Sequence, residues 1–188
     1  MKKRIAIFAS GTGSNAVNFI NYFKNHDSIE VALVLSNNNE APVLQKAESL
    51  GIETVAITNS AAANGSFMVS LLSSYNVHFV VLAGYLRLIP RELIAEYENN
   101  MVNIHPSLLP KYGGKGMYGC RVHKAVIENK EKESGITIHM VNAIYDDGEV
   151  LFRAKVDVNQ DDTQDSLAQK IHKLEHAHFP KVVEALLC

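Results

Sequence analysis

The residues best suited to chemistry are Asn103 and His105, which stand one residue apart in Met101-Val-Asn-Ile-His-Pro-Ser-Leu-Leu-Pro110. In an extended strand, alternate side chains share a face. Pro106 lacks an amide hydrogen and biases His105 toward extended backbone, so the strand should end here. A carboxamide can donate to a developing oxyanion, and an imidazole can donate or move a proton near neutral pH. The pair indicates a catalytic site at a sheet edge, although either residue alone is more typical of a capped strand before a turn.

A glycine-rich loop, Ser10-Gly-Thr-Gly-Ser-Asn15, follows the first apolar run and precedes a helical pattern over 16–23. Glycine lets backbone amides approach a ligand, and the helix start offers unpaired N–H groups, so we expect a phosphate here. Gly11, Gly13 and Ala16 also fit the dinucleotide fingerprint. However, Ser36-Asn-Asn-Asn39 stands where that fingerprint needs an acidic residue, and there is no Walker lysine. A simple phosphate ester fits better than NAD or ATP, with a structural turn as the alternative.

The elements that must position these residues follow an alternating order. Short apolar runs predict strands, and the helical pattern over 42–50 has Pro42 in its first turn and Gly51 to end it. This order predicts an α/β fold with a mostly parallel open sheet, helices on both faces and a Rossmann-like N-terminal half. The predicted strands are 5–9, 31–35, 54–57, 79–83 and 101–104.

The C-terminal half has a different pattern. A helix is predicted near 122–128, followed by strands around 136–141 and 150–158 that can pair antiparallel. A long final helix should begin near Asp162 or Thr163, whose oxygens can cap it, and bend or restart at Pro180.

Length and composition limit the function. With 188 residues, 47% of them hydrophobic, the chain can form one sizeable core, so we expect a single domain over 1–188. The 18 basic and 20 acidic residues leave no excess positive charge for nucleic acid.

The N-terminus and the cysteines bear on location. Met1-Lys-Lys-Arg4 looks like the start of a signal peptide, but the apolar run over 5–9 is too short, so no membrane association and a cytoplasmic location are expected. Cys120 and Cys188 lack the spacing of a disulfide framework or a thiolate zinc site.

Taken together, the motifs resemble the folate-dependent formyltransferases, and within them the enzymes acting on 5'-phosphoribosylglycinamide (GAR). The resemblance covers nearly the whole chain. It implies transfer of a formyl group from 10-formyltetrahydrofolate to the GAR amine, giving formyl-GAR in de novo purine (IMP) biosynthesis, without a metal. The motifs are Gly11-Thr-Gly-Ser-Asn15, Val81-Leu-Ala-Gly-Tyr-Leu-Arg-Leu-Ile89, Asn103-Ile-His-Pro-Ser-Leu-Leu-Pro110, Gly135-Ile-Thr-Ile-His139 with Asp146, and Glu175-His176.

The resemblance also assigns residue roles. It implies a phosphate-binding half over about 1–100 and a folate and catalytic half over about 101–188. The catalytic residues would be Asn103, His105 and Asp146, and GAR would be bound by Gly13, Ser14, Asn15, His172 and Glu175. Folate would be bound by Leu86, Arg87, Leu88, Ile89, Asn103, Asn142, Ala143, Ile144, Tyr145 and Asp146.

Two expectations concern the immediate surroundings of His105. A neighbouring carboxylate favours imidazolium, so Asp146 should raise the pKa of His105, with the adjacent Asp147 as the alternative carboxylate. The segment 111–119 contains four glycines and suggests a mobile lid, with a plain flexible connector as the alternative.

Other functions remain in view. His172-Lys-Leu-Glu-His176 matches an inverted zinc-protease signature, but it is short and lacks an evident third ligand. Formyltetrahydrofolate hydrolase and methionyl-tRNA formyltransferase share the polar trio but usually carry extra domains, for which this length leaves no room. A catalytically silent folate or sugar-phosphate binding module is the alternative from another class. A monomer or weak homodimer is expected.

Overall fold

Seven strands form one sheet in the hydrogen-bonded order β3-β2-β1-β4-β5-β6-β7, in a computed structural model that describes residues 1–188. The pairs β1–β2, β1–β4 and β2–β3 are parallel, and β6–β7 is antiparallel. The predicted α/β class with a mostly parallel sheet is therefore confirmed. The strands are β1 (Lys3–Phe8), β2 (Ile29–Ser36), β3 (Thr54–Ala56), β4 (Phe79–Leu82), β5 (Met101–His105), β6 (Glu133–Met140) and β7 (Val150–Asp157).

Seven helices accompany the strands, and the chain divides into two units. The first unit is Met1–Val102 with Glu184–Cys188, and the second is Asn103–Val183. No helix is both long and apolar enough to cross a membrane. The helices are α1 (Ser14–Phe23), α2 (Pro42–Ser49), α3 (Asn59–Ala62), α4 (Gly65–Ser74), α5 (Arg91–Glu96), α6 (Cys120–Glu128) and α7 (Gln164–Leu187).

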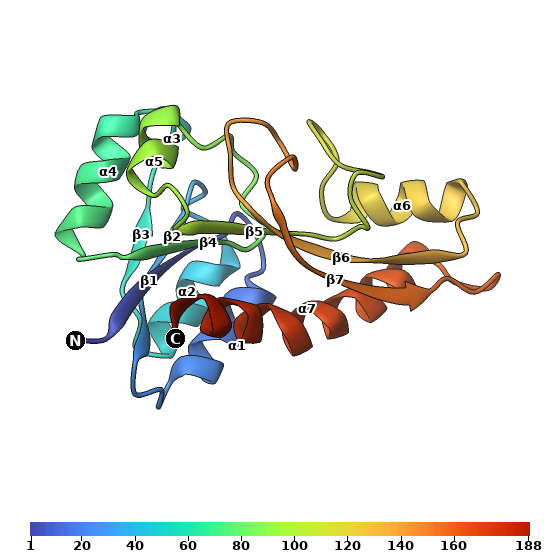
Figure 1. Ribbon diagram of the computed structural model, residues 1–188, viewed down its shortest axis with the longest axis horizontal. Coiled ribbons are helices and arrows are strands. Elements are labelled where there is room, and N and C mark those ends of the chain that lie inside the picture. Colours follow the sequence, from blue (N-terminus) through green and yellow to red (C-terminus); the bar gives the residue numbers. More distant parts are fainter. The chain divides into compact units, whose positions relative to one another are not determined.

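In the first unit, helices cover both faces of the parallel strands. Figure 1 shows α1 and α2 on one face of these strands and α3, α4 and α5 on the other. Strand β4 is buried at every position, as is nearly all of β2, because side chains on both faces of such a sheet need apolar neighbours. Helix α1 buries Ala16, Phe19, Ile20 and Phe23, the spacing that places residues on one helical face.

In the second unit, β6 and β7 form an antiparallel pair with α6 on one side and α7 on the other (Figure 1). Thr163 caps α7 as expected, since its Oγ1 accepts from the Ser166 amide at 3.2 Å and its own amide donates to Ser166 Oγ at 3.0 Å. Of the bend or restart predicted at Pro180, the restart is wrong, because α7 is continuous through that residue, and the bend stays a prediction.

The loop before α1 depends on Gly13, which gives a first testable prediction. Gly13 has φ +73°, and a Cβ there would lie 2.2 Å from Val43 Cγ2. Gly13→Ala combines backbone strain with a clash, so we expect the free energy of unfolding to fall by about 2 kcal/mol in urea titrations.

The neighbouring Gly11 offers a matched control, because a Cβ on Gly11 would meet nothing within 4 Å. Gly11→Ala should leave stability nearly unchanged. Adding Val43→Ala to Gly13→Ala removes the Val43 Cγ2 but keeps its Cβ, which would still lie 2.5 Å from the new methyl group, so the double variant should recover little stability. Equal stability of the two alanine variants would contradict the role given to Gly13.

Candidate active site

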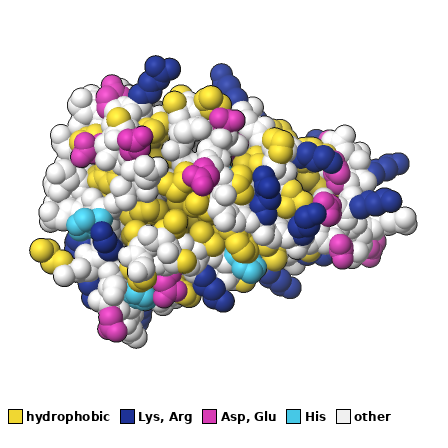
Figure 2. Space-filling view, viewed as in Figure 1, with side chains coloured by type: hydrophobic (Ala, Val, Ile, Leu, Met, Phe, Trp, Pro, Cys, Tyr) yellow, Lys and Arg dark blue, Asp and Glu magenta, His cyan; other side chains and the backbone are white.

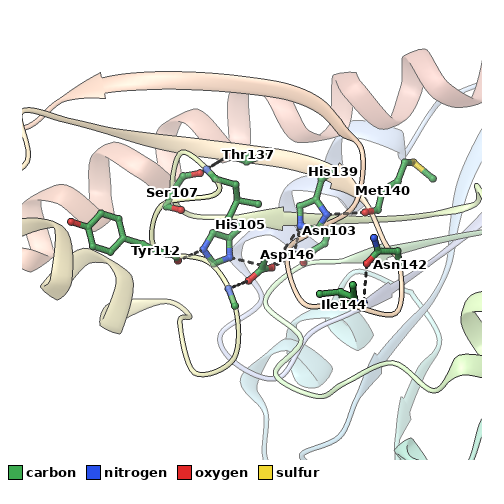
Figure 3. Close-up of polar contacts among 12 residues, drawn as sticks. Asn103, His105, Ser107, Tyr112, Thr137, His139, Met140, Asn142, Ile144 and Asp146 are labelled. Carbon is green, nitrogen blue, oxygen red and sulfur yellow. Dashed lines mark hydrogen bonds and ion pairs between the residues drawn. The ribbon is translucent and has the colours of Figure 1, made fainter.

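The C-terminal end of β5 delivers Asn103 and His105 to a cluster that also contains His139 of β6 and Asp146 of the following loop (Figure 3). All four residues belong to the second unit. The extended backbone before Pro106 puts Asn103 and His105 on the same side, as predicted from their spacing. His105 and His139 are both buried. The structure therefore brings together the three residues expected to be catalytic and adds a fourth.

Both ring nitrogens of His105 face an acceptor. Nε2 lies 2.7 Å from the Tyr112 carbonyl oxygen, and Nδ1 lies 3.5 Å from Asp146 Oδ1. A carbonyl can only accept, so Nε2 carries the hydrogen. A proton added at Nδ1 would point at the carboxylate, so the imidazolium form would have both of its N–H groups directed at oxygen atoms. The ring is thus placed to receive a proton.

The resting protonation of His105 differs from the expectation that Asp146 would raise its pKa. Burial lowers the pKa of His105 below its ordinary value, and it outweighs the Asp146 charge and the Tyr112 carbonyl, which act in the opposite direction. A positive charge on His139 would lower the pKa of His105 further. The free protein therefore favours neutral His105 at neutral pH.

Asp146, not Asp147, is the carboxylate beside His105. Asp146 Oδ2 accepts from the Gly114 amide at 2.8 Å, and Oδ1 accepts from Asn103 Nδ2 at 3.4 Å. Burial raises the pKa of Asp146, but the nearby His139 and His105 rings and the Gly114 amide together bring it below its usual range. Asp147 is instead on the exposed side, where its Oδ2 accepts from Asn142 at 3.4 Å.

His139 is a site residue to which the sequence analysis assigns no role. Its Nδ1 donates to the Met140 carbonyl at 2.8 Å, so Nε2 is free to accept from Asn103 Nδ2 at 3.1 Å. The His139 tautomer therefore requires the Nδ2 end of the Asn103 amide to face His139. The available signal was a histidine in the apolar strand predicted over 136–141, a position where an unpaired ring would be unfavourable.

The first part of the glycine-rich segment 111–119 touches the cluster. Tyr112 has φ +56° and presents its carbonyl to His105, while the Gly114 amide reaches Asp146. Main-chain atoms of one loop therefore contact both members of the histidine and carboxylate pair. Whether the segment opens as a lid stays a prediction.

The predicted phosphate-binding residues lie in the first unit. Gly13, Ser14 and Asn15 stand at the start of α1, where no side chain caps the helix. The Ser10 side chain fixes the start of the loop, since its Oγ donates to Asn37 Oδ1 at 2.6 Å and accepts from the Leu86 amide at 2.9 Å. Uncapped amides at a helix start suit an anion.

The two predicted folate segments both expose large apolar side chains. In the first unit, Leu86 and Leu88 are exposed, while Ile89 is buried in the core. In the second unit, Ile144 is 64% exposed and Tyr145 is also exposed, on a turn closed by the Ile144 amide donating to Asn142 Oδ1. Exposed apolar side chains of this kind fit a flat organic ligand.

The remaining predicted residues, His172 and Glu175, lie on α7 in the second unit. Glu175 is buried. The rings of His172 and His176 are stacked with centroids 6.4 Å apart, as their spacing on one helix face requires. No group of three or more His, Cys, Asp or Glu side chains is arranged to hold a metal ion.

Comparison with known proteins agrees with the resemblance. The family model described as "Formyl transferase" matches residues 3–183. The chain belongs to the formyl transferase family. Among its relatives, a Bacillus subtilis (strain 168) protein named phosphoribosylglycinamide formyltransferase is 33% identical, with 98% of this chain and 95% of that protein covered.

Two further members of the family are similar over the chain. An Arabidopsis thaliana protein named phosphoribosylglycinamide formyltransferase, chloroplastic, is 39% identical over 98% of this chain, which spans 65% of the length of that relative. The crystal structure of phosphoribosylglycinamide formyltransferase from Bacillus halodurans has a TM-score of 0.89 and 34% identity, with 98% of this chain and 95% of that chain covered.

A second prediction concerns His123 of α6, which is buried and whose Nδ1 has no hydrogen-bond partner. Burial, with the charges of His172 and His105, lowers the pKa of His123 to about 4. Between pH 4 and 6.5 the unfolded chain thus binds more protons than the folded one, so this contribution to stability is complete above about pH 6.5 and is lost as pH falls.

We expect urea titrations to show a loss of about 2 kcal/mol from His123 over this range. His123→Leu should flatten that part of the pH dependence. His78→Asn replaces an exposed histidine whose ring accepts from the Arg4 amide, and it should keep the wild-type slope. The same slope in wild type and His123→Leu would rule out His123 as the source.

Proposed function

We propose that this protein transfers the formyl group of 10-formyltetrahydrofolate to the amine of GAR, giving formyl-GAR in de novo purine (IMP) biosynthesis. The observation that carries the proposal is the cluster of Asn103, His105 and Asp146, held by His139 and by the main chain of Tyr112 and Gly114. The names of the relatives support the same reaction.

In the proposed reaction, the GAR amine attacks the formyl carbon and negative charge collects on the formyl oxygen. Asn103 Nδ2 donates one N–H to His139, while the hydrogen bond from Nδ2 to Asp146 Oδ1 is long at 3.4 Å. That second N–H is the one an oxyanion would attract. A donor placed in this way is typically worth a factor of 10²–10³ in rate.

His105 supplies the proton chemistry in this proposal. The oxyanion adds negative charge beside a ring whose resting pKa is low, so the pKa of His105 rises as the intermediate forms. The amine's proton can then be taken up, directly or through water, with Asp146 stabilising the imidazolium. Breaking the bond between the formyl carbon and the folate nitrogen, with return of a proton to that nitrogen, completes the transfer.

The binding roles belong to the same proposal. Gly13, Ser14 and Asn15 would hold the GAR phosphate, and His172 and Glu175 the ribose. Leu86 to Ile89 and Asn142 to Asp146 would hold the folate. The chain would act as one formyltransferase domain, as a monomer or weak homodimer, without nucleic acid or membrane partners. Two exposed and unpaired cysteines fit a reducing location such as the cytoplasm.

The test is transfer from 10-formyltetrahydrofolate to GAR, followed by the absorbance of the deformylated folate, with a control lacking GAR. Turnover that depends on GAR is the expected result. Deformylation without GAR would support the hydrolase in its place, and binding of both ligands without turnover would support a silent binding module.

A further inference from the structure

The second unit contains a cavity of about 520 Å³ that the proposed reaction does not use. It lies between the loop after β5, the C-terminal end of α6 and the outer strand β7. None of Asn103, His105, His139 and Asp146 lines it. Its volume falls within the range of about 300–1,000 Å³ typical of pockets for small organic ligands.

The rim of this cavity is strongly basic. Five of its lining residues are cationic and two are anionic. Lys111 pairs with Glu131 and Lys155 pairs with Glu133, each at 3.0 Å, so both carboxylates are already neutralised. Lys130, Lys132 and Arg153 have no ion-pair partner, although Arg153 donates one N–H to the Leu109 carbonyl. Three positive charges therefore remain uncompensated. Figure 2 shows Lys and Arg side chains gathered over this part of the molecule.

The floor of the cavity is apolar. Leu109 and Val126 are buried, and Leu108 lines the cavity beside them. A basic rim over an apolar floor fits an organic anion with a flat apolar body better than it fits a small inorganic ion. Planar guanidinium and ammonium groups together suit phosphate groups.

The backbone at the rim is unusual. Lys130 follows the end of α6 with φ +52°, a position where glycine is the favoured residue. Tyr112, which also lines the cavity, has φ +56°. A long cationic side chain is thus kept where glycine would fold more easily, which is the pattern expected when the side chain serves a ligand.

We propose that this cavity binds a nucleoside di- or triphosphate. The phosphates would contact Lys130, Lys132 and Arg153, and the base would lie on the floor made by Leu108, Leu109 and Val126. A nucleoside diphosphate carries about three negative charges at neutral pH, which matches the three free cations of the rim.

The cavity is connected to the proposed catalytic histidine. Glu131 binds both Lys111 and the Tyr112 hydroxyl, at 3.0 Å each, and the Tyr112 carbonyl contacts His105 Nε2. A phosphate that competes with Glu131 for Lys111 would shift the 111–112 segment. Occupancy should therefore change the environment of the His105 ring. This second effect on turnover rests on the proposed function, whereas binding itself does not.

The experiment is calorimetric titration of the full chain with ATP and with ADP, without folate or GAR and at 150 mM salt. Lys130→Gln with Lys132→Gln should raise Kd at least tenfold. The matched control, Lys24→Gln with Lys124→Gln, removes the same charge from positions outside the cavity and should leave Kd within twofold. Neither pair touches the proposed catalytic machinery, so both should retain basal activity.

Four outcomes would overturn the proposal. The first is no binding at millimolar nucleotide, and the second is equal weakening by the two double variants. The third is an unchanged Kd in Lys130→Gln with Lys132→Gln, which would place the nucleotide at another site such as the glycine-rich loop. The fourth comes from a parallel titration with triglutamate, in which tighter binding of this polycarboxylate than of ATP would exclude the nucleotide. Because no turnover is measured, loss of the proposed function would leave this result intact.

Discussion

Replacing His105 with alanine should lower kcat for formyl transfer by about 10³-fold, with a much smaller change in KM. The ring combines proton transfer with stabilisation of the oxyanion, and each effect is typically worth a factor of 10² or more. Steady-state kinetics with saturating GAR and 10-formyltetrahydrofolate would measure it. The expected result follows from the position of the ring between Tyr112 and Asp146.

Two comparisons keep this prediction specific. His78→Ala removes an exposed histidine before β4 and should leave kcat unchanged. Near-UV circular dichroism should show that His105→Ala is folded. A loss of less than tenfold in the folded variant would mean that His105 is not the proton-transferring group.

Gly148→Ala should lower kcat by about 10²-fold although residue 148 contacts no substrate in the proposed reaction. A Cβ at this position would lie 1.7 Å from the Met140 carbonyl oxygen and 2.7 Å from its carbon, so backbone must move. The turn is closed by the Met140 amide donating to the Glu149 carbonyl at 2.8 Å, so the displacement passes into the loop that carries Asp146. A shift of about 1 Å in a catalytic group can cost 10²-fold.

The control for crowding is Gly51→Ala. Gly51 ends α2, and a Cβ there would meet nothing within 4 Å, although its φ of +79° makes alanine strained. Gly51→Ala should lose stability but keep its kcat. If Gly148→Ala retained wild-type kcat, the loop would not be the element that positions Asp146.

The sequence was informative where local physics decides the structure. The predicted strand over 101–104 became Met101–His105, and the helix predicted over 42–50 became Pro42–Ser49. In both, an apolar run is ended by a residue with a strong backbone preference, Pro106 or Gly51. These signals place Asn103 and His105 on one side of a strand end without any knowledge of tertiary contacts.

The sequence did not predict those properties of the site that depend on burial and on main-chain atoms distant along the chain. Desolvation is the largest influence on the pKa of His105 and lowers it, whereas the presence of Asp146 in the sequence suggests only a raised pKa. The contact of Nε2 with the Tyr112 carbonyl depends on a loop with positive φ at a tyrosine, which sequence preferences do not favour. The part played by His139 depends on β6 lying where its ring meets Asn103.

The Tyr112 carbonyl accepts a hydrogen bond from His105, and the Gly114 amide donates one to Asp146, so the order of that loop depends on the two side chains it touches. Removing either side chain releases part of the loop, and removing the second then releases little more. The rate losses of His105→Ala and Asp146→Ala should for this reason combine to less than their product, with a coupling free energy of about 1–3 kcal/mol in a double-mutant cycle. Part of the apparent catalytic contribution of each residue is therefore the conformational entropy of a segment that takes no part in the chemistry.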